Sequence, residues 1–119
     1  MATLTDALAR LAADLTAAGL PATTDPRNFH PPAVLVLWDT VTPRTSCMAR
    51  ADVRLLAVAP GPSHGDALAW LDDAVAAIWS VIRPVEARMS VVEHPGTGAQ
   101  LLGAELVHTL DYRYTPDTP

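Results

Sequence analysis

Residues 22–39 constrain the fold most, because they join a proline-bounded loop directly to an uninterrupted apolar run. Asp25-Pro26 is a pair that initiates turns, and Pro31-Pro32 imposes extended backbone on the residue before each ring. Residues 33–38 are all apolar, which is the pattern of a strand covered on both faces. We therefore expect a short strand at 22–24, a stiff loop and then a buried strand.

A helix is predicted before this segment. Four leucines recur there at helical spacing, and Gly19 with Pro21 supplies a typical helix end. The leucine stripe is narrow, so this helix should rest on a surface rather than be surrounded. Its members are Leu4, Leu8, Leu11 and Leu15.

A second helix is predicted from about residue 64 to Ile82, with Ser63 and Asp66 as a capping box and Pro84 as its stop. Apolar residues cover about half of its circumference, whereas a helix on a single sheet needs a stripe of only about 100°. We therefore expect it to touch two surfaces: the sheet, and either the first helix or a neighbouring subunit. Its apolar flank comprises Leu68, Leu71, Val75, Ile78, Trp79 and Ile82, extended by Ala67, Trp70, Ala74, Ala77 and Val81.

Three further segments, 47–59, 85–93 and 102–113, alternate between apolar and polar residues, as half-buried strands do. The last two flank a turn and predict a hairpin. In the first, Arg50, Asp52 and Arg54 point away from the core, so the outer face of the sheet should carry charges of both signs. The inward sets are Ala49, Ala51, Val53 and Leu55; Val85, Ala87, Met89 and Val91; and Leu102, Ala104, Leu106, His108, Leu110 and Tyr112.

The predicted order of elements, α-β-β-β-α-β-β, indicates an α+β fold, with a mixed or antiparallel sheet and two helices packed on one face. Residues 1–119 are expected to form one domain, with 115–119 frayed. Half of the residues are apolar, but alanine supplies much of that share. The core should therefore be thin in large side chains, and a partner surface would complete it.

Composition excludes several classes of function. The net charge is −5 and the arginines are spread singly, so no basic stripe is available for phosphate contacts. Cys47 is the single cysteine, which excludes an internal disulfide framework and a cysteine-rich metal cluster. The N-terminus does not have the pattern of a signal peptide, and no apolar run reaches membrane length. We expect a soluble protein made in the cytoplasm.

Signals for chemistry are weak. Residues 60–66 combine a strand end, a glycine loop and a helix start, an arrangement that binds anions through free amides. Lysine is absent, however, and Asp66 places a negative charge there. His64 and Asp66 could share a metal ion, although a loop histidine beside a capping aspartate is the simpler interpretation. No catalytic, metal or cofactor residue is predicted, and the alternative of a small ligand-binding or enzymatic domain rests on residues 60–66.

The proline-bounded loop is better suited to protein contacts. Phe29 is the only phenylalanine in the chain and lies between prolines, close to Arg27. A rigid loop of this kind loses little entropy on docking, and aromatic residues and arginine are enriched at interface hot spots. The predicted subunit or partner interface comprises Asp25, Arg27, Asn28, Phe29, His30, Arg50, Arg54 and Trp70.

Three short stretches near the N-terminus resemble the tail terminator proteins of long-tailed bacteriophages, with the closest likeness to those from phages of actinobacteria. They are Ala-Gly-Leu-Pro21 after an Ala/Leu helix, Thr23-Thr24-Asp25-Pro26-Arg27, and Pro31-Pro32-Ala33-Val34-Leu35-Val36. The predicted order of elements is similar to that family over nearly the whole chain.

The resemblance implies a structural role. Family members form a ring, typically a hexamer, on the last ring of the tail tube, where they stop tube polymerisation and present the surface that joins the head. The implied partners are further copies of the chain, the major tail tube protein and a head-completion protein, while DNA passes through the lumen without sequence-specific binding. No catalytic residue, cofactor or membrane is implied, and the location is the virion, at the head–tail junction. Another head–tail connector or minor tail protein is the nearest alternative.

Overall fold

The structure, a computed structural model, describes residues 4–28, 30, 32–59, 64–82, 86–93 and 100–113. The order of elements along the chain is the predicted one, and the α+β class is confirmed. The elements are α1 (Leu4–Ala17), β1 (Ala22–Thr23), the 3-10 turn η1 (Pro26–Asn28), β2 (Ala33–Pro43), β3 (Met48–Val58), α2 (His64–Val81), β4 (Ala87–Glu93) and β5 (Gln100–Arg113).

Several predicted features lie outside the described residues. These are Phe29, the loop and cap at 60–63, Pro84, Val85, the turn at 94–98 and the chain end at 115–119.

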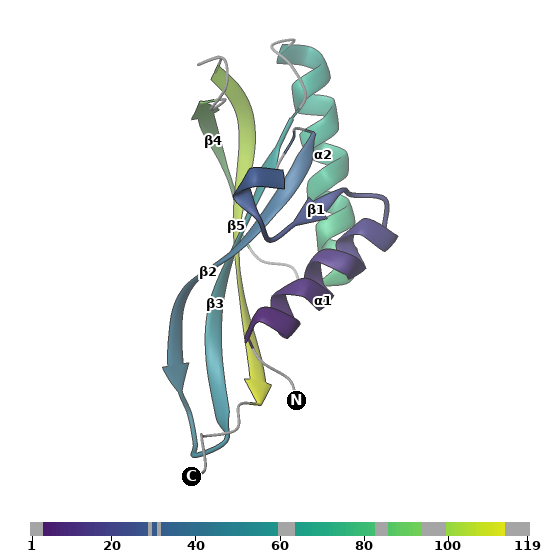
Figure 1. Ribbon diagram of the computed structural model, residues 1–119. Coiled ribbons are helices and arrows are strands. Elements are labelled where there is room, and N and C mark those ends of the chain that lie inside the picture. Colours follow the sequence, from purple (N-terminus) through teal and green to yellow (C-terminus); the bar gives the residue numbers. More distant parts are fainter. Residues whose placement is uncertain are drawn as a thin grey trace.

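The five strands form one mixed sheet in the order β1-β2-β3-β5-β4. Only the β1–β2 pair is parallel; the other three pairs are antiparallel. Both helices lie on the same face of this sheet, as Figure 1 shows. The predicted two-layer arrangement is therefore correct.

Gly19 ends α1 in the way that the sequence predicts. Its φ of 98° lies in the left-handed region. This conformation lets the Leu20 N–H donate to the Leu15 carbonyl at 3.0 Å and the Gly19 N–H donate to the Thr16 carbonyl at 3.0 Å. The pair of bonds is a Schellman motif, and it satisfies two carbonyls that the helix itself leaves free. Leu15 and Leu20 are both buried in the main core.

The main core lies between the helices and the sheet. At its centre, Val36, Leu55 and Leu106 form a row across β2, β3 and β5, and all three are fully buried. Leu15 from α1 and Ile78 from α2 belong to the same cluster and are also fully buried. The alternation predicted for 47–59 is confirmed, because its inward residues are all buried: Ala49, Ala51, Val53 and Leu55.

The strand at 33–38 was expected to be covered on both faces, and this is wrong beyond Val36. Leu37 is 37% exposed and Trp38 is 53% exposed. Next to them the register passes from Trp38 opposite Val53 to Thr40 opposite Asp52, which leaves Asp39 as the extra residue of a β-bulge. Past this bulge the β2–β3 hairpin and the end of β5 extend beyond the helices (Figure 1), so the helix layer does not cover them.

The residues predicted to point inward from 85–93 do lie on the helix side of the sheet where they are described, but the prediction that they are buried is wrong. Met89 pairs with Ala104 and Val91 with Leu102, so their side chains lie on the helix side of the sheet. They are nevertheless 58% and 61% exposed. The reason is that α2 packs chiefly on β3 and β5 and leaves the outermost strand without cover.

The opposite face of the sheet is charged over only part of its area. Arg50, Asp52 and Arg54 lie there as predicted, towards the hairpin end of β3. Farther along, Val58 and Leu35 occupy the same face and are buried, with relative exposures of 0% and 8%. The outer face therefore carries charges of both signs, as expected, but only towards the hairpin end of β3.

Candidate subunit interface

The predicted interface loop begins with a turn that its own side chains hold. The Thr23 hydroxyl accepts the Asp25 N–H at 3.1 Å, and Asp25 Oδ1 accepts the Arg27 N–H at 3.0 Å. The Arg27 guanidinium reaches the same carboxylate at 3.4 Å, yet its side chain remains 91% exposed. His30 is also exposed, and Asn28 ends η1. The loop therefore presents Arg27 and His30 outward from a hydrogen-bonded base.

The predicted Arg50 and Arg54 lie on the other face of the sheet and are paired within the chain. Arg50 Nε is 3.1 Å from Asp111, and Arg54 lies 3.4 Å from Glu105 and 3.7 Å from Asp39. All of these groups are substantially exposed, so each pair contributes little to stability, about 0–1 kcal/mol. Their main effect is to order the side chains across three strands.

Asp52 extends this polar lattice. Its carboxylate accepts hydrogen bonds from Thr40 on β2 at 2.8 Å and from Thr109 on β5 at 3.1 Å. The carboxylates of this face, Asp39, Asp52, Glu105 and Asp111, lie among Arg50, Arg54 and Arg113. The hairpin half of the face is thus ordered and carries charges of both signs.

The predicted Trp70 has a different setting. It is partly buried and packs against the main core. The structure thus spreads the seven predicted interface residues that it describes over three places: the loop, the outer sheet face and the flank of α2. Their role at an interface stays a prediction.

The exposed apolar surface was predicted only for α2, and the sequence prediction missed its part on the strands. Large hydrophobic side chains are exposed along α2, on β4, on β5 and next to the bulge of β2. They are Leu37, Trp38, Leu68, Trp79, Met89, Val91 and Val107. The alternation along 85–93 and the apolar run at 33–38 had predicted burial, since a strand has the same pattern whether its own helix or another subunit covers it.

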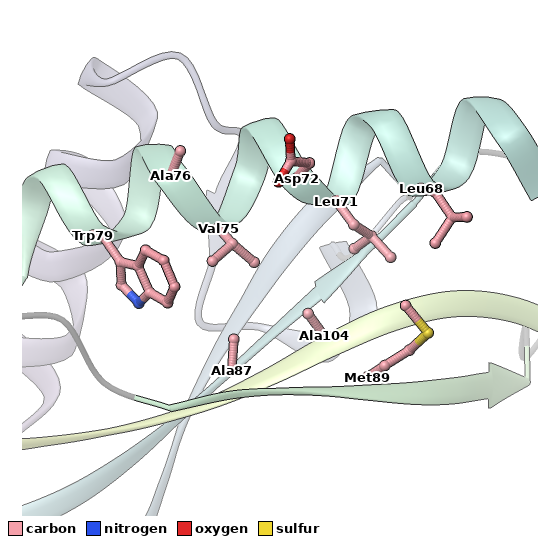
Figure 2. Close-up of a pocket in the computed structure, with 9 residues that line it drawn as sticks. All are labelled: Leu68, Leu71, Asp72, Val75, Ala76, Trp79, Ala87, Met89 and Ala104. Atoms are coloured by element: carbon pink, nitrogen blue, oxygen red, sulfur yellow. The ribbon is translucent and has the colours of Figure 1, made fainter.

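An open apolar groove runs between α2 and β4, with a volume of about 370 Å³. Figure 2 shows Leu68, Val75 and Trp79 pointing from the helix towards the strands, with Met89 below them. The lining comprises Leu68, Leu71, Asp72, Val75, Ala76, Trp79, Ala87, Met89 and Ala104. Asp72 is the only charged residue among the described ones that line it, so the groove favours an apolar occupant.

The second flank of the apolar arc of α2 was predicted to meet either the first helix or a neighbouring subunit. The structure decides between these two only for part of the flank. Within the described chain α2 does contact α1. Even so, Leu68 and Trp79 are still 38% and 42% exposed. The first helix therefore covers only part of the apolar arc of α2.

Comparison with known proteins leaves the family open: no protein-family model matches the chain, and no curated protein is significantly similar to it.

The described residues offer few features of a chemical site. Among them no three His, Cys, Asp or Glu side chains are grouped to hold a metal ion, and none of the helices has the length and apolarity to cross a lipid bilayer. The thiol of Cys47 is exposed near the tip of the β2–β3 hairpin.

His108 is the one described titratable group with a clear perturbation. It lies on the helix side of β5, opposite Val53, and burial lowers its pKa from the usual value of 6.5. The unfolded chain therefore binds more protons than the folded chain between the lowered pKa and 6.5. We expect the free energy of unfolding to fall as the pH drops from 7.5 to 5.5.

This pH effect is measured by urea unfolding at both pH values for the wild type and for His108→Gln. The variant has no group to protonate at this position, so it should lose less stability over the same interval. Equal losses in the two proteins would assign the pH dependence to other groups.

Proposed function

We propose that this chain is a structural protein of a phage virion: a tail terminator that forms a hexameric ring on the end of the tail tube. In this role the ring stops tube polymerisation and provides the surface to which the head is joined. Its partners are further copies of the chain, the major tail tube protein and a head-completion protein.

The observation that carries the proposal is the exposed apolar surface at both sides of the sheet. Trp38 is exposed on β2, and Met89 and Val91 are exposed on β4 beside the groove of α2. A closed ring of identical subunits joins two different patches of each copy, head to tail. Two separate apolar patches on one small domain are what such a contact requires.

Two further features support this role. Three short stretches within residues 18–36 resemble the terminator family, and this part of the chain follows α1 and contains β1, η1 and the start of β2. The chain is also acidic, with a net charge of −5. An acidic ring allows DNA to pass without adhering to the wall, because like charges repel.

The test is assembly of the purified protein, followed by light scattering for mass and negative-stain microscopy for shape. We expect rings of hexameric mass that bind the ends of uncapped tail tubes from a long-tailed actinobacterial phage. Rings that bind only head connectors would favour the alternative of another connector protein. A protein that stays monomeric at every concentration, with and without tubes, would contradict the proposal.

A further inference from the structure

Among the described residues, each side of the sheet has a length of strand backbone that no neighbouring strand pairs with. β4 pairs only with β5 among the described residues. On the other side, β1 covers β2 only at Val34 and Leu35, so residues 36–43 have no partner on that side within the described chain. Unpaired strand edges of this kind are templates for pairing with another chain.

The strand directions permit these two edges to pair with each other. β3 is antiparallel to β2, β5 is antiparallel to β3, and β4 is antiparallel to β5. β4 therefore runs antiparallel to β2. If a second copy joins its β2 edge to β4 and keeps its helices on the same face, only one orientation in the plane is possible. In that orientation the junction is an antiparallel pair, the more stable kind.

The side chains of the two edges also match by face. Trp38 lies on the helix side of β2, because it pairs with the inward Val53. Met89 and Val91 lie on the helix side of β4. In a shared sheet, Trp38 of one copy would thus stand beside Met89 and Val91 of the next and would enter the groove below Trp79.

On the face of the sheet away from the helices, the two edges carry charges of opposite sign. Arg88 lies there, since it pairs in register with Glu105, and its side chain is 79% exposed. Asp39 lies on the same face, 3.7 Å from Arg54, and is 58% exposed. Pairing of the two edges would place the Arg88 guanidinium of one copy near the Asp39 carboxylate of the next.

We propose that copies of this chain join by adding the β4 edge of one to the open β2 edge of the next, with Trp38 seated in the groove between α2 and β4. The occupant of the groove is therefore a second copy of the chain. The inference rests on the self-assembly contained in the proposed function and specifies which two surfaces carry it. The β4 strand of one copy then continues the line of β1 in the next.

Cysteine cross-linking tests the contact directly. In a full-length Cys47→Ser background, Trp38→Cys is placed on one copy and Met89→Cys or Val91→Cys on the other. Disulfides need Cα atoms within about 7 Å of each other, which neighbouring strands provide. We expect covalent dimers only when a β2 variant is mixed with a β4 variant, and a ladder of larger species when both cysteines are on one chain.

The single variants are informative controls. Met89→Cys alone should stay uncross-linked; dimers from it would mean that two β4 edges pair symmetrically, which overturns the proposal. Asp73→Cys, on an exposed position of α2, should give no product with Trp38→Cys. Absence of product from every β2–β4 pair would also overturn the proposal.

A surface substitution gives an independent measurement. Val91→Lys introduces a charge on an edge strand, a device that natural sheets use to prevent pairing. We expect it to weaken self-association by about tenfold or more, as loss of a central apolar contact does, without shifting the thermal midpoint of unfolding. Val107→Lys is the matched control, because Val107 is 49% exposed on the other face of β5 and should leave association unchanged.

The charge pair predicts a smaller effect. Arg88→Asp should weaken association about threefold, the scale of an exposed ion pair, and Asp39→Arg added to it should restore the affinity. If the double variant does not regain the wild-type affinity of self-association, Arg88 and Asp39 do not form this contact.

These results separate the contact from the function. Rings that cap tail tubes but give no β2–β4 cross-link would overturn the inference and leave the proposed function. Cross-linked β2–β4 assemblies that fail to cap tubes would overturn the function and leave the inference.

Discussion

Leu55→Ala is expected to lower the free energy of unfolding by about 3–4 kcal/mol, within the range found for large-to-small changes at fully buried sites. Leu55 has no exposed surface and stands between Val36 and Leu106 in the central row of the sheet. Many of its neighbours in the core are alanines, which have no side-chain freedom to move into the space left behind. The substitution should therefore leave a cavity.

Urea unfolding of the wild type and Leu55→Ala, at a protein concentration where both have the same association state, measures this effect. The thermal midpoint should fall by roughly 10 °C or more. Val107→Ala is the control: it removes apolar atoms from the same sheet at a half-exposed position, and its effect should stay within about 0.5 kcal/mol. A loss below about 1 kcal/mol for Leu55→Ala would mean that this row is not the centre of the core.

Gly19→Ala and Gly65→Ala are expected to act in opposite directions. No heavy atom lies within 4 Å of a Cβ added at either position, so neither change creates a clash. Gly19 has a φ of 98°, which costs an L-residue about 1–2 kcal/mol. Gly65 lies in the first turn of α2, where alanine is the better helix former by up to about 1 kcal/mol.

The two variants thus control each other, because the same methyl group is added in both. Unfolding free energies from urea titrations should fall for Gly19→Ala and rise for Gly65→Ala. A destabilisation of equal size at both positions would contradict the conformational explanation for Gly19.

Most of the fold could be predicted because local signals coincide with tertiary needs. The leucine stripe of α1, the end of that helix at Gly19 and the alternation of β3 all follow from residues close in sequence. Each of these signals is a local preference that agrees with the burial and pairing in the folded chain.

The exposed surface could not be predicted in the same way. Met89 and Val91 have the alternation of inward residues, and they do face inward, but only the position of α2 over β3 and β5 decides that they remain uncovered. Likewise, the bulge at Asp39 depends on how β2 and β3 pair, which no single strand encodes. The candidate interface was therefore only partly accessible from the sequence, through the loop at 25–30 and the wide apolar arc of α2.

The place of β5 in the sheet has a consequence for synthesis. This strand is the last described element of the chain, yet it lies between β3 and β4 and pairs with both. Residues as far apart as Met48 and Arg113 must meet to complete the sheet. Because such distant pairing is entropically costly, we expect folding on the scale of milliseconds to seconds. Until residues 100–113 leave the ribosome, this edge of β3 lacks its partner strand, so the nascent chain cannot complete its core before this late segment has been made.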